Sequence, residues 1–213
     1  MRRRPKILAA LVAVALPMTV TGVSSGGPPA ATAATPGPTS AVVAEAFHSA
    51  SAKYGVPESV LLALSYAETR WDDHQGKAST SGGFGPMHLT AVAPSELMDR
   101  SNGEKLAKAD SLQTLYKASD LTGLDPAALR NDAAANIAGG AALLASYQQQ
   151  MKLPVGASTS AAEWYGAVSA YAGAADRTSA SAFADDVYAI LARGAARTTN
   201  TGQQLVKIGR AHV

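Results

Sequence analysis

An all-α domain is the fold class that the sequence predicts, and we expect it to follow an N-terminal export signal. Apolar residues recur at helical spacing from Ser40 onward, and strand alternation flanked by hairpin turns is absent. The 213 residues include no cysteine, which excludes disulfides, thiolate metal sites and a cysteine nucleophile. The apolar share of 47% excludes a wholly disordered chain.

Residues 1–33 have the three parts of a secretory signal peptide. A basic start, Met1–Lys6, precedes an apolar run, Ile7–Leu16, and Ala31–Ala33 fits a small-x-small cleavage site. The run is shorter than the ~20 residues that a spanning helix needs. An uncleaved anchor is the alternative, but we expect cleavage, export to the extracellular space or cell wall, and no membrane association afterwards. Residues 34–40 are expected to be a disordered linker.

The net charge of +2 comes from the export signal. Residues 1–34 contain four basic and no acidic side chains, so 14 basic and 16 acidic residues remain in the rest of the chain. A slightly acidic body argues against a nucleic-acid partner bound by phosphate neutralisation.

Start and stop signals predict the helices in order. Ser40 caps a helix that Gly55 ends, and Pro57 opens a helix that runs to about Arg70. Gly76–Pro86 is expected to be a loop. Capping residues and apolar stripes predict further helices over Thr90–Met98, over Ser101–Ser119, from Asp125-Pro126, from Asn131 or Asp132 to about Met151, from Thr159 or Ser160 to Tyr171, and from Ser179 to the stop at Gly194.

Glu68 stands out because it lies on the apolar side of the 57–70 helix. Leu61, Leu64, Glu68 and Trp71 follow the spacing i, i+3, i+7 and i+10, which places them on one face. Lost hydration and the negative end of the helix dipole both raise the pKa of a carboxyl there. A carboxylic acid that stays protonated near neutral pH suits a general acid. A solvated or ion-paired glutamate at the edge of the stripe is the alternative.

Four segments together resemble the lysozyme-like lytic transglycosylases of the soluble (SLT) type. Glu68-Thr69 resembles the Glu-Ser that closes a helix in that family, and Ser79–Thr90 resembles Ser-x-x-Gly-x-x-Gly-Leu-Met-Gln followed by threonine. Asn136–Leu144 resembles Asn-Ile-x-x-Gly-x-x-Tyr-Leu, and Ala170–Gly173 resembles Ala-Tyr-Asn-x-Gly. The resemblance implies a goose-lysozyme or SLT-type helical fold over 41–196, expected as a monomer.

The resemblance also implies cleavage of the β-1,4 bond between N-acetylmuramic acid and N-acetylglucosamine in peptidoglycan glycan strands. Glu68 would protonate the glycosidic oxygen and then remove the proton of the C6 hydroxyl, leaving a 1,6-anhydro end without a metal or cofactor. The implied substrate-binding residues are Ser79, Gly85, Met87, His88 and Tyr171. Other glycosidases need a second carboxyl; the nearest candidates, Asp72 and Asp73, are expected to be a solvated pair.

The chain departs from the family pattern at Pro86, His88 and Ala172, which stand for leucine, glutamine and asparagine. His88 either keeps a donor for substrate or is a buried histidine bonded to the backbone. Tyr171 either bonds to Glu68 or sugar, or packs in the core. Trp71 either stacks on a sugar or closes the core.

A second resemblance gives the alternative function. The Gly85–Thr90 variant is similar to the N-terminal module of secreted actinobacterial N-acetylmuramoyl-L-alanine amidases. On that reading the chain is a catalytically weak wall-binding module, fused to an amidase domain that would lie outside this chain. The four histidines show no zinc-ligand spacing.

The C-terminal residues are expected to lie outside the domain. Residues 197–207 would begin a linker to a further region. Lys207–Val213 can be encoded by AAG ATC GGA AGA GCA CAC GTC, which resembles a common sequencing adapter, and we hypothesise that 208–213 are an artefact. A genuine short tail is the alternative.

Overall fold

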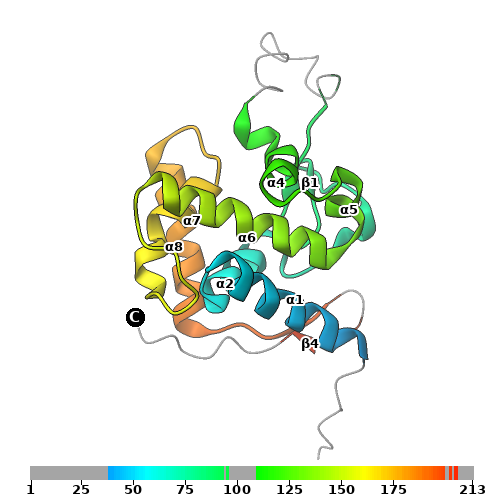
Figure 1. Ribbon diagram of the computed structural model, residues 1–213, viewed down its shortest axis with the longest axis horizontal. Coiled ribbons are helices and arrows are strands. Elements are labelled where there is room, and N and C mark those ends of the chain that lie inside the picture. The colour runs from blue at the N-terminus through cyan, green and yellow to red at the C-terminus, as the bar shows by residue number, and fades with distance from the viewer. Residues whose placement is uncertain (1–37, 94, 96–108, 200–201, 203, 206–213) are drawn as a thin grey trace, which may run out of the picture. The chain divides into compact units, whose positions relative to one another are not determined.

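The computed structural model describes residues 38–93, 95, 109–199, 202 and 204–205. Helices predominate among them, which confirms the all-α prediction (Figure 1). The α-helices are α1 (Pro38–Tyr54), α2 (Glu58–Thr69), α4 (Thr114–Thr122), α5 (Pro126–Asn131), α6 (Ala133–Gln150), α7 (Tyr165–Tyr171) and α8 (Arg177–Arg193).

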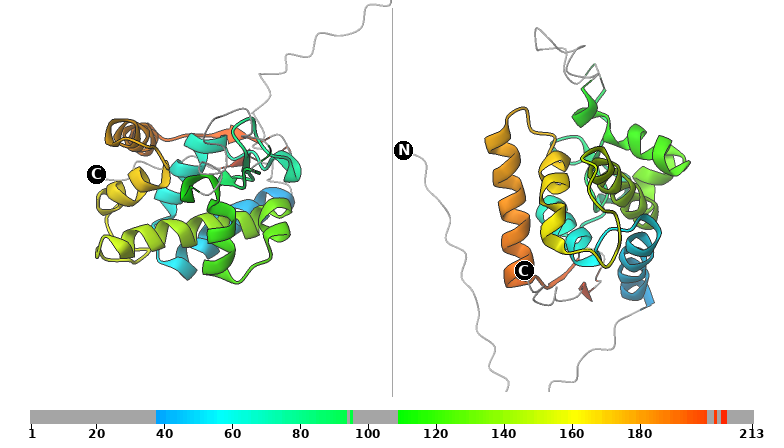
Figure 2. Two further views of the ribbon diagram at one scale, coloured as in Figure 1. Left: turned by 90° about the horizontal axis from the view of Figure 1, so that it is seen from above. Right: turned by 60° about the vertical axis from the view of Figure 1, so that its left-hand side comes forward.

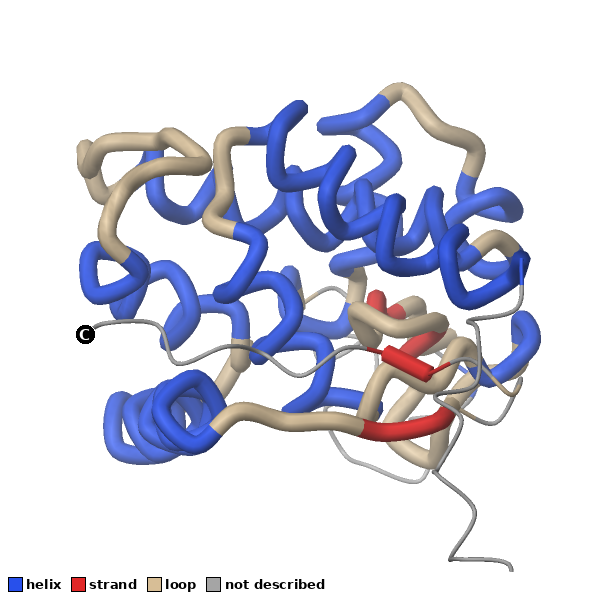
Figure 3. The backbone as a smooth tube through the Cα atoms, turned by 90° about the horizontal axis from the view of Figure 1, so that it is seen from below, coloured by secondary structure: helices blue, strands red, loops and turns tan. Residues whose placement is uncertain are grey.

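Short elements join the helices. Two antiparallel strand pairs are present in the described residues, and Figure 3 shows the strands as brief red stretches. One pair is β1 (Gly83–Phe84) with β2 (Leu89–Thr90), and the other is β3 (Arg197–Thr198) with β4 (Gln204–Leu205). Single 3-10 turns are η1 (His74–Gly76), η3 (Asp110–Leu112) and η4 (Ala161–Trp164).

Helix α6 is the element around which the others pack. Helices α1, α4, α5 and α7 all contact it, whereas α2 packs against α8 and α1 (Figures 1 and 2). Its buried side is rich in small residues, so neighbours approach its backbone closely. At Gly140, the side chain of Met87 occupies the space of a Cβ, with atoms 2.6 Å from that position.

Aspartate caps set the starts of three helices. The side chains of Asp125, Asp132 and Asp176 accept hydrogen bonds from the backbone N–H of Ala127, Ala135 and Ser179. Of the two caps proposed for the long helix, Asp132 is therefore the one used. The last helix begins earlier than the predicted Ser179, because Asp176 caps it and its first residue is Arg177.

The predicted apolar faces form one core. Val43, Phe47 and Ala50 of α1 are buried, as the stripe in the sequence predicts. The largest fully buried side chains come from several elements, so burial of apolar surface from the whole domain stabilises the fold. They include Trp71, Trp164, Phe47, Leu61, Leu64, Leu115, Leu129, Ile137 and Leu143.

Two sequence predictions near the start and the middle of the domain are wrong. Helix α1 begins at Pro38, inside the predicted 34–40 linker. Thr90 does not begin a helix: it ends β2, where its backbone N–H donates to Thr114 Oγ1 (2.8 Å) and ties the strand to α4. Residues 94 and 96–98 of the predicted Thr90–Met98 helix lie outside the described part of the chain. Residues 101–108 of the next predicted helix, Ser101–Ser119, also lie outside it.

The packed part of the chain continues past the predicted boundary at residue 196. Within the predicted 197–207 linker, β3 pairs with β4, and Leu205 is only 3% exposed in the core cluster. Strand β4 contacts α1, so burial of Leu205 holds this segment on the helices. The predicted signal peptide, 1–33, and the predicted artefact, 208–213, lie outside the described residues. No described helix combines the length and apolar character that crossing a membrane requires.

Replacing Leu205 with alanine tests this boundary. We expect Leu205→Ala to lower the free energy of unfolding by about 2–4 kcal/mol, because it leaves a cavity in the core. Urea denaturation followed by circular dichroism measures the change. The matched control is Leu153→Ala, since Leu153 is 41% exposed, and it should stay within about 0.5 kcal/mol of the parent chain. If both substitutions changed the free energy of unfolding equally, residues 197–207 would be a linker and not part of the packed domain.

Candidate active site

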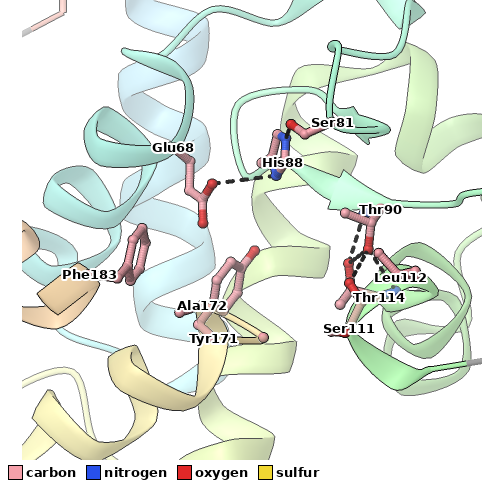
Figure 4. Close-up of a pocket in the computed structure, with 11 residues that line it drawn as sticks. Glu68, Ser81, His88, Thr90, Ser111, Leu112, Thr114, Tyr171, Ala172 and Phe183 are labelled. Atoms are coloured by element: carbon pink, nitrogen blue, oxygen red, sulfur yellow. Dashed lines mark hydrogen bonds and ion pairs between the residues drawn. The ribbon is translucent and has the colours of Figure 1, made fainter. Parts of the chain in front are cut away.

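A cleft of about 270 Å³ lies where the end of α2, the β1–β2 turn, the η3–α4 segment and the end of α7 meet (Figure 4). Its lining brings together side chains that are far apart in sequence. They include Glu68, Ser81, His88, Thr90, Tyr171 and Phe183. Among the described lining residues, Glu68 is the only carboxylic acid.

The end of α2 holds Glu68 at the cleft. Arg70, the C-cap, adopts a left-handed conformation (φ 56°), and its N–H donates to the carbonyl of Tyr66, so the helix ends at Thr69, one residue after Glu68. Trp71 also has positive φ, and its indole Nε1–H donates to the Leu62 carbonyl (2.9 Å). Because Trp71 is only 2% exposed, it closes the core rather than stacking on a sugar.

Glu68 is a desolvated acid. Its side chain is 15% exposed, and no hydrogen bond reaches its carboxyl from the described residues. Burial raises its pKa from 4.5 to about 7. The predicted shift is confirmed in direction and in its desolvation cause, and a well-solvated glutamate at the edge of the stripe is excluded by this burial.

His88 is the nearest polar partner of Glu68. Its Nδ1 lies 3.4 Å from Glu68 Oε2, while its Nε2 lies 3.0 Å from Ser79 Oγ and 2.9 Å from Ser81 Oγ. The ring packs over Gly83, where a Cβ would lie 2.2 Å from the imidazole. Burial lowers the pKa of His88, and the positive charge of His74 adds to this shift.

A buried amide fixes the loop that carries His88. Asn136 on α6 is fully buried; its Oδ1 accepts from the Met87 N–H (2.8 Å), and its Nδ2 donates to the carbonyls of Phe84 (2.9 Å) and Leu129 (2.8 Å). Gly85 has φ +63°, and a Cβ there would lie 2.4 Å from the Asn136 side chain. Only glycine satisfies both the left-handed backbone and this close approach.

Two more helices bind the same loop. From α2, the hydroxyls of Ser65 (2.9 Å) and Thr69 (2.8 Å) both donate to the Pro86 carbonyl. From α7, the Tyr171 hydroxyl donates to the Met87 carbonyl (2.7 Å). Helices α2, α6 and α7 thus meet on residues 84–87, directly before His88.

The predicted substrate-binding residues fall into two groups. His88 and Tyr171 line the cleft with Glu68. The Tyr171 hydroxyl donates its hydrogen to the Met87 carbonyl, so it does not donate to Glu68. Ser79 supports the His88 ring, and Gly85 and Met87 are buried behind the cleft.

The acidic residues after α2 do not supply a second carboxyl to the cleft. Asp72 lies 3.2 Å from Arg197 Nη1 in an ion pair, and the same guanidinium donates to the Arg70 carbonyl. Asp73 caps η1 through the backbone N–H of Gln75. The expectation of a solvated pair is therefore wrong for Asp72, which is bound to β3.

Sequence reasoning missed the polar residues that complete the site. Ser81 and Thr90 line the cleft, and Ser65 and Thr69 bond to the loop. A signal for Ser65 and Thr69 was present, because their i, i+4 spacing puts both on one side of α2. Thr90 carries no such signal, since its partners, Ser111 and Thr114, come from a distant segment.

Comparisons with family models, with curated proteins and with solved structures found no match for this chain. Among the described residues, no cluster of three or more histidine, aspartate or glutamate side chains has a geometry that could hold a metal ion. The cleft thus offers a desolvated carboxylic acid, Glu68, beside the imidazole of His88.

Substituting Asn136 tests the role of the buried amide. Asn136→Ala should lower the free energy of unfolding by about 2–4 kcal/mol, because it removes the partners of three backbone groups. Chemical denaturation measures the loss. Gln149→Ala, on the exposed side of the same helix, is the control and should change stability by no more than about 0.5 kcal/mol.

The pKa of Glu68 predicts a pH-dependent stability. The folded state holds this proton more tightly than the unfolded state, so the contribution is complete below pH 4.5 and is lost as the pH rises through about 7. Relative to Glu68→Gln, the parent chain should lose up to about 3 kcal/mol across that range. Urea denaturation at a series of pH values measures the difference.

The control for this titration is Glu45→Gln, since Glu45 is exposed on α1. Its stability should follow that of the parent chain at every pH. A stability difference between the parent chain and Glu68→Gln that does not change with pH would contradict the raised pKa.

Proposed function

We propose that this domain cleaves the β-1,4 bond between N-acetylmuramic acid and N-acetylglucosamine in peptidoglycan, with Glu68 as both acid and base. One observation carries the proposal: Glu68 is an acid in the cleft whose side chain is only 15% exposed and whose pKa is raised to about 7. The four segments that resemble the SLT-type transglycosylases support it, and a lysozyme-like arrangement of the helices belongs to the same proposal. The export signal would place the domain at the cell wall.

The reaction needs one carboxyl because the substrate supplies the nucleophile. Neutral Glu68 donates its proton to the glycosidic oxygen as the bond from that oxygen to C1 of the muramoyl sugar breaks. The resulting carboxylate removes the proton of the C6 hydroxyl, whose oxygen bonds to C1 and forms the 1,6-anhydro ring. Glu68 ends protonated, as it began, and no water is consumed.

Desolvation of Glu68 suits both of these steps. At neutral pH a group with a pKa of about 7 is present in both its acid and its base form. Burial disfavours the carboxylate that the first step produces, so the carboxylate readily takes a proton in the second step. The described lining holds no other carboxyl that could activate water from the opposite side, as inverting glycosidases require.

Digestion of purified peptidoglycan tests the proposal. The parent chain should release muropeptides with 1,6-anhydro ends, detected by mass spectrometry. Glu68→Gln should reduce the rate by at least about 100-fold, because the amide cannot transfer the proton. Glu45→Gln should keep the parental rate. Products with reducing ends would instead show hydrolysis, and would require a second carboxyl that the described lining of the cleft does not contain.

A wall-binding module attached to an amidase is the second candidate. Ala172 lines the cleft where the similar family motif has asparagine, so a polar contact to substrate is absent at that position. Co-sedimentation with insoluble peptidoglycan separates the two functions. Equal binding by the parent chain and Glu68→Gln, with no soluble product from either, would favour the module.

A further inference from the structure

Three polar atoms form a closed triangle at the edge of the cleft. Ser79 Oγ, Ser81 Oγ and His88 Nε2 lie 2.9–3.1 Å from one another. Ser79 Oγ also accepts a hydrogen bond from the Gly83 N–H (3.2 Å). That bond occupies a lone pair of Ser79 and leaves its hydroxyl hydrogen for use inside the triangle.

Counting hydrogens in the triangle favours one tautomer of His88. If Nε2 is unprotonated, the two hydroxyl hydrogens make two bonds inside the triangle, for example Ser79 to Ser81 and Ser81 to Nε2. If Nε2 carries the proton, it accepts nothing, so the three contacts can hold only two hydrogen bonds for three hydrogens, and one hydroxyl hydrogen must leave the triangle. The first arrangement bonds every hydrogen inside the triangle, and it places the ring proton on Nδ1.

The Nδ1 proton faces Glu68. Since Nδ1 lies 3.4 Å from Oε2, an Nδ1–H group points its positive end toward that oxygen. The acid proton of neutral Glu68 is then favoured on the other oxygen, Oε1. Figure 4 shows one carboxyl oxygen of Glu68 on the His88 side and the other directed away from it, toward the side of Tyr171.

We propose that His88, oriented by Ser79 and Ser81, is a positioning residue that keeps the proton of Glu68 on the carboxyl oxygen that faces the cleft. The opposite tautomer would accept the acid proton at Nδ1 and hold it away from substrate. This inference rests on the proposed function, because it assigns His88 a part in the first proton transfer. It also explains why two serines surround one nitrogen of the ring.

Nitrogen-15 NMR of the histidine rings tests the tautomer without any substrate. Near neutral pH, the parent chain should show His88 protonated at Nδ1 and unprotonated at Nε2. In the double variant Ser79→Ala/Ser81→Ala, the Nε2–H form should increase, because no hydroxyl is left to donate to Nε2. His48, exposed on α1, is the internal control and should keep its pattern. A parent chain with Nε2–H at His88 would overturn the proposal.

Kinetics on soluble glycan strands test the consequence. Ser79→Ala/Ser81→Ala should lower kcat by about 10–100-fold, and this loss should exceed any rise in KM, since the proton of Glu68 is misplaced. Ser49→Ala, an exposed serine on α1, should change neither constant. An unchanged kcat in the double variant, with the tautomer shifted, would overturn the proposal.

A conservative substitution separates positioning from structural support. The amide of His88→Gln can donate to Glu68 and accept from a serine, so kcat should stay within about 10-fold of the parent value, whereas His88→Ala should lose about 100-fold. Equal losses in the two variants would contradict positioning. If the parent chain cleaves no glycan, the proposed function fails, and the NMR result alone then decides whether His88 holds the proposed tautomer.

Discussion

The site depends on a single buried amide. Asn136 projects from the central helix α6, and its three hydrogen bonds join that helix to the loop of residues 84–87 and to the end of α5. A buried polar group must be fully bonded to be tolerated, and each bond of Asn136 goes to a backbone group. The loop therefore has one conformation that satisfies the amide, and the place of His88 follows from it.

The same loop links the two sides of the cleft. Ser65 and Thr69 bind it to the helix that carries Glu68, while Tyr171 binds it from α7. The hydroxyls close to Glu68 therefore donate hydrogen bonds to carbonyl groups of the loop and not to the Glu68 carboxyl. The nearest polar partner of Glu68 among the described residues is His88 Nδ1, at 3.4 Å, and desolvation dominates the pKa of the carboxyl.

The sequence predicted the helices and the acid well, because both depend on local patterns. The spacing of Leu61, Leu64 and Glu68 was enough to place the glutamate on a buried face. The bond from Thr90 to Thr114 on α4 and the burial of Leu205 against α1 involve partners 24 or more residues away, and local sequence propensity does not report such contacts. The two serines come together around the His88 ring only in the folded loop, so their spacing in the sequence does not predict the group.

The link between β3 and the end of α2 has a mechanical consequence. Arg197 binds both the carbonyl of Arg70 and the carboxylate of Asp72, so the segment that follows α8 is fastened to the turn directly after Glu68. One guanidinium therefore couples the segment that follows α8 to the end of α2 that carries Glu68, so that a displacement of either would act on the other.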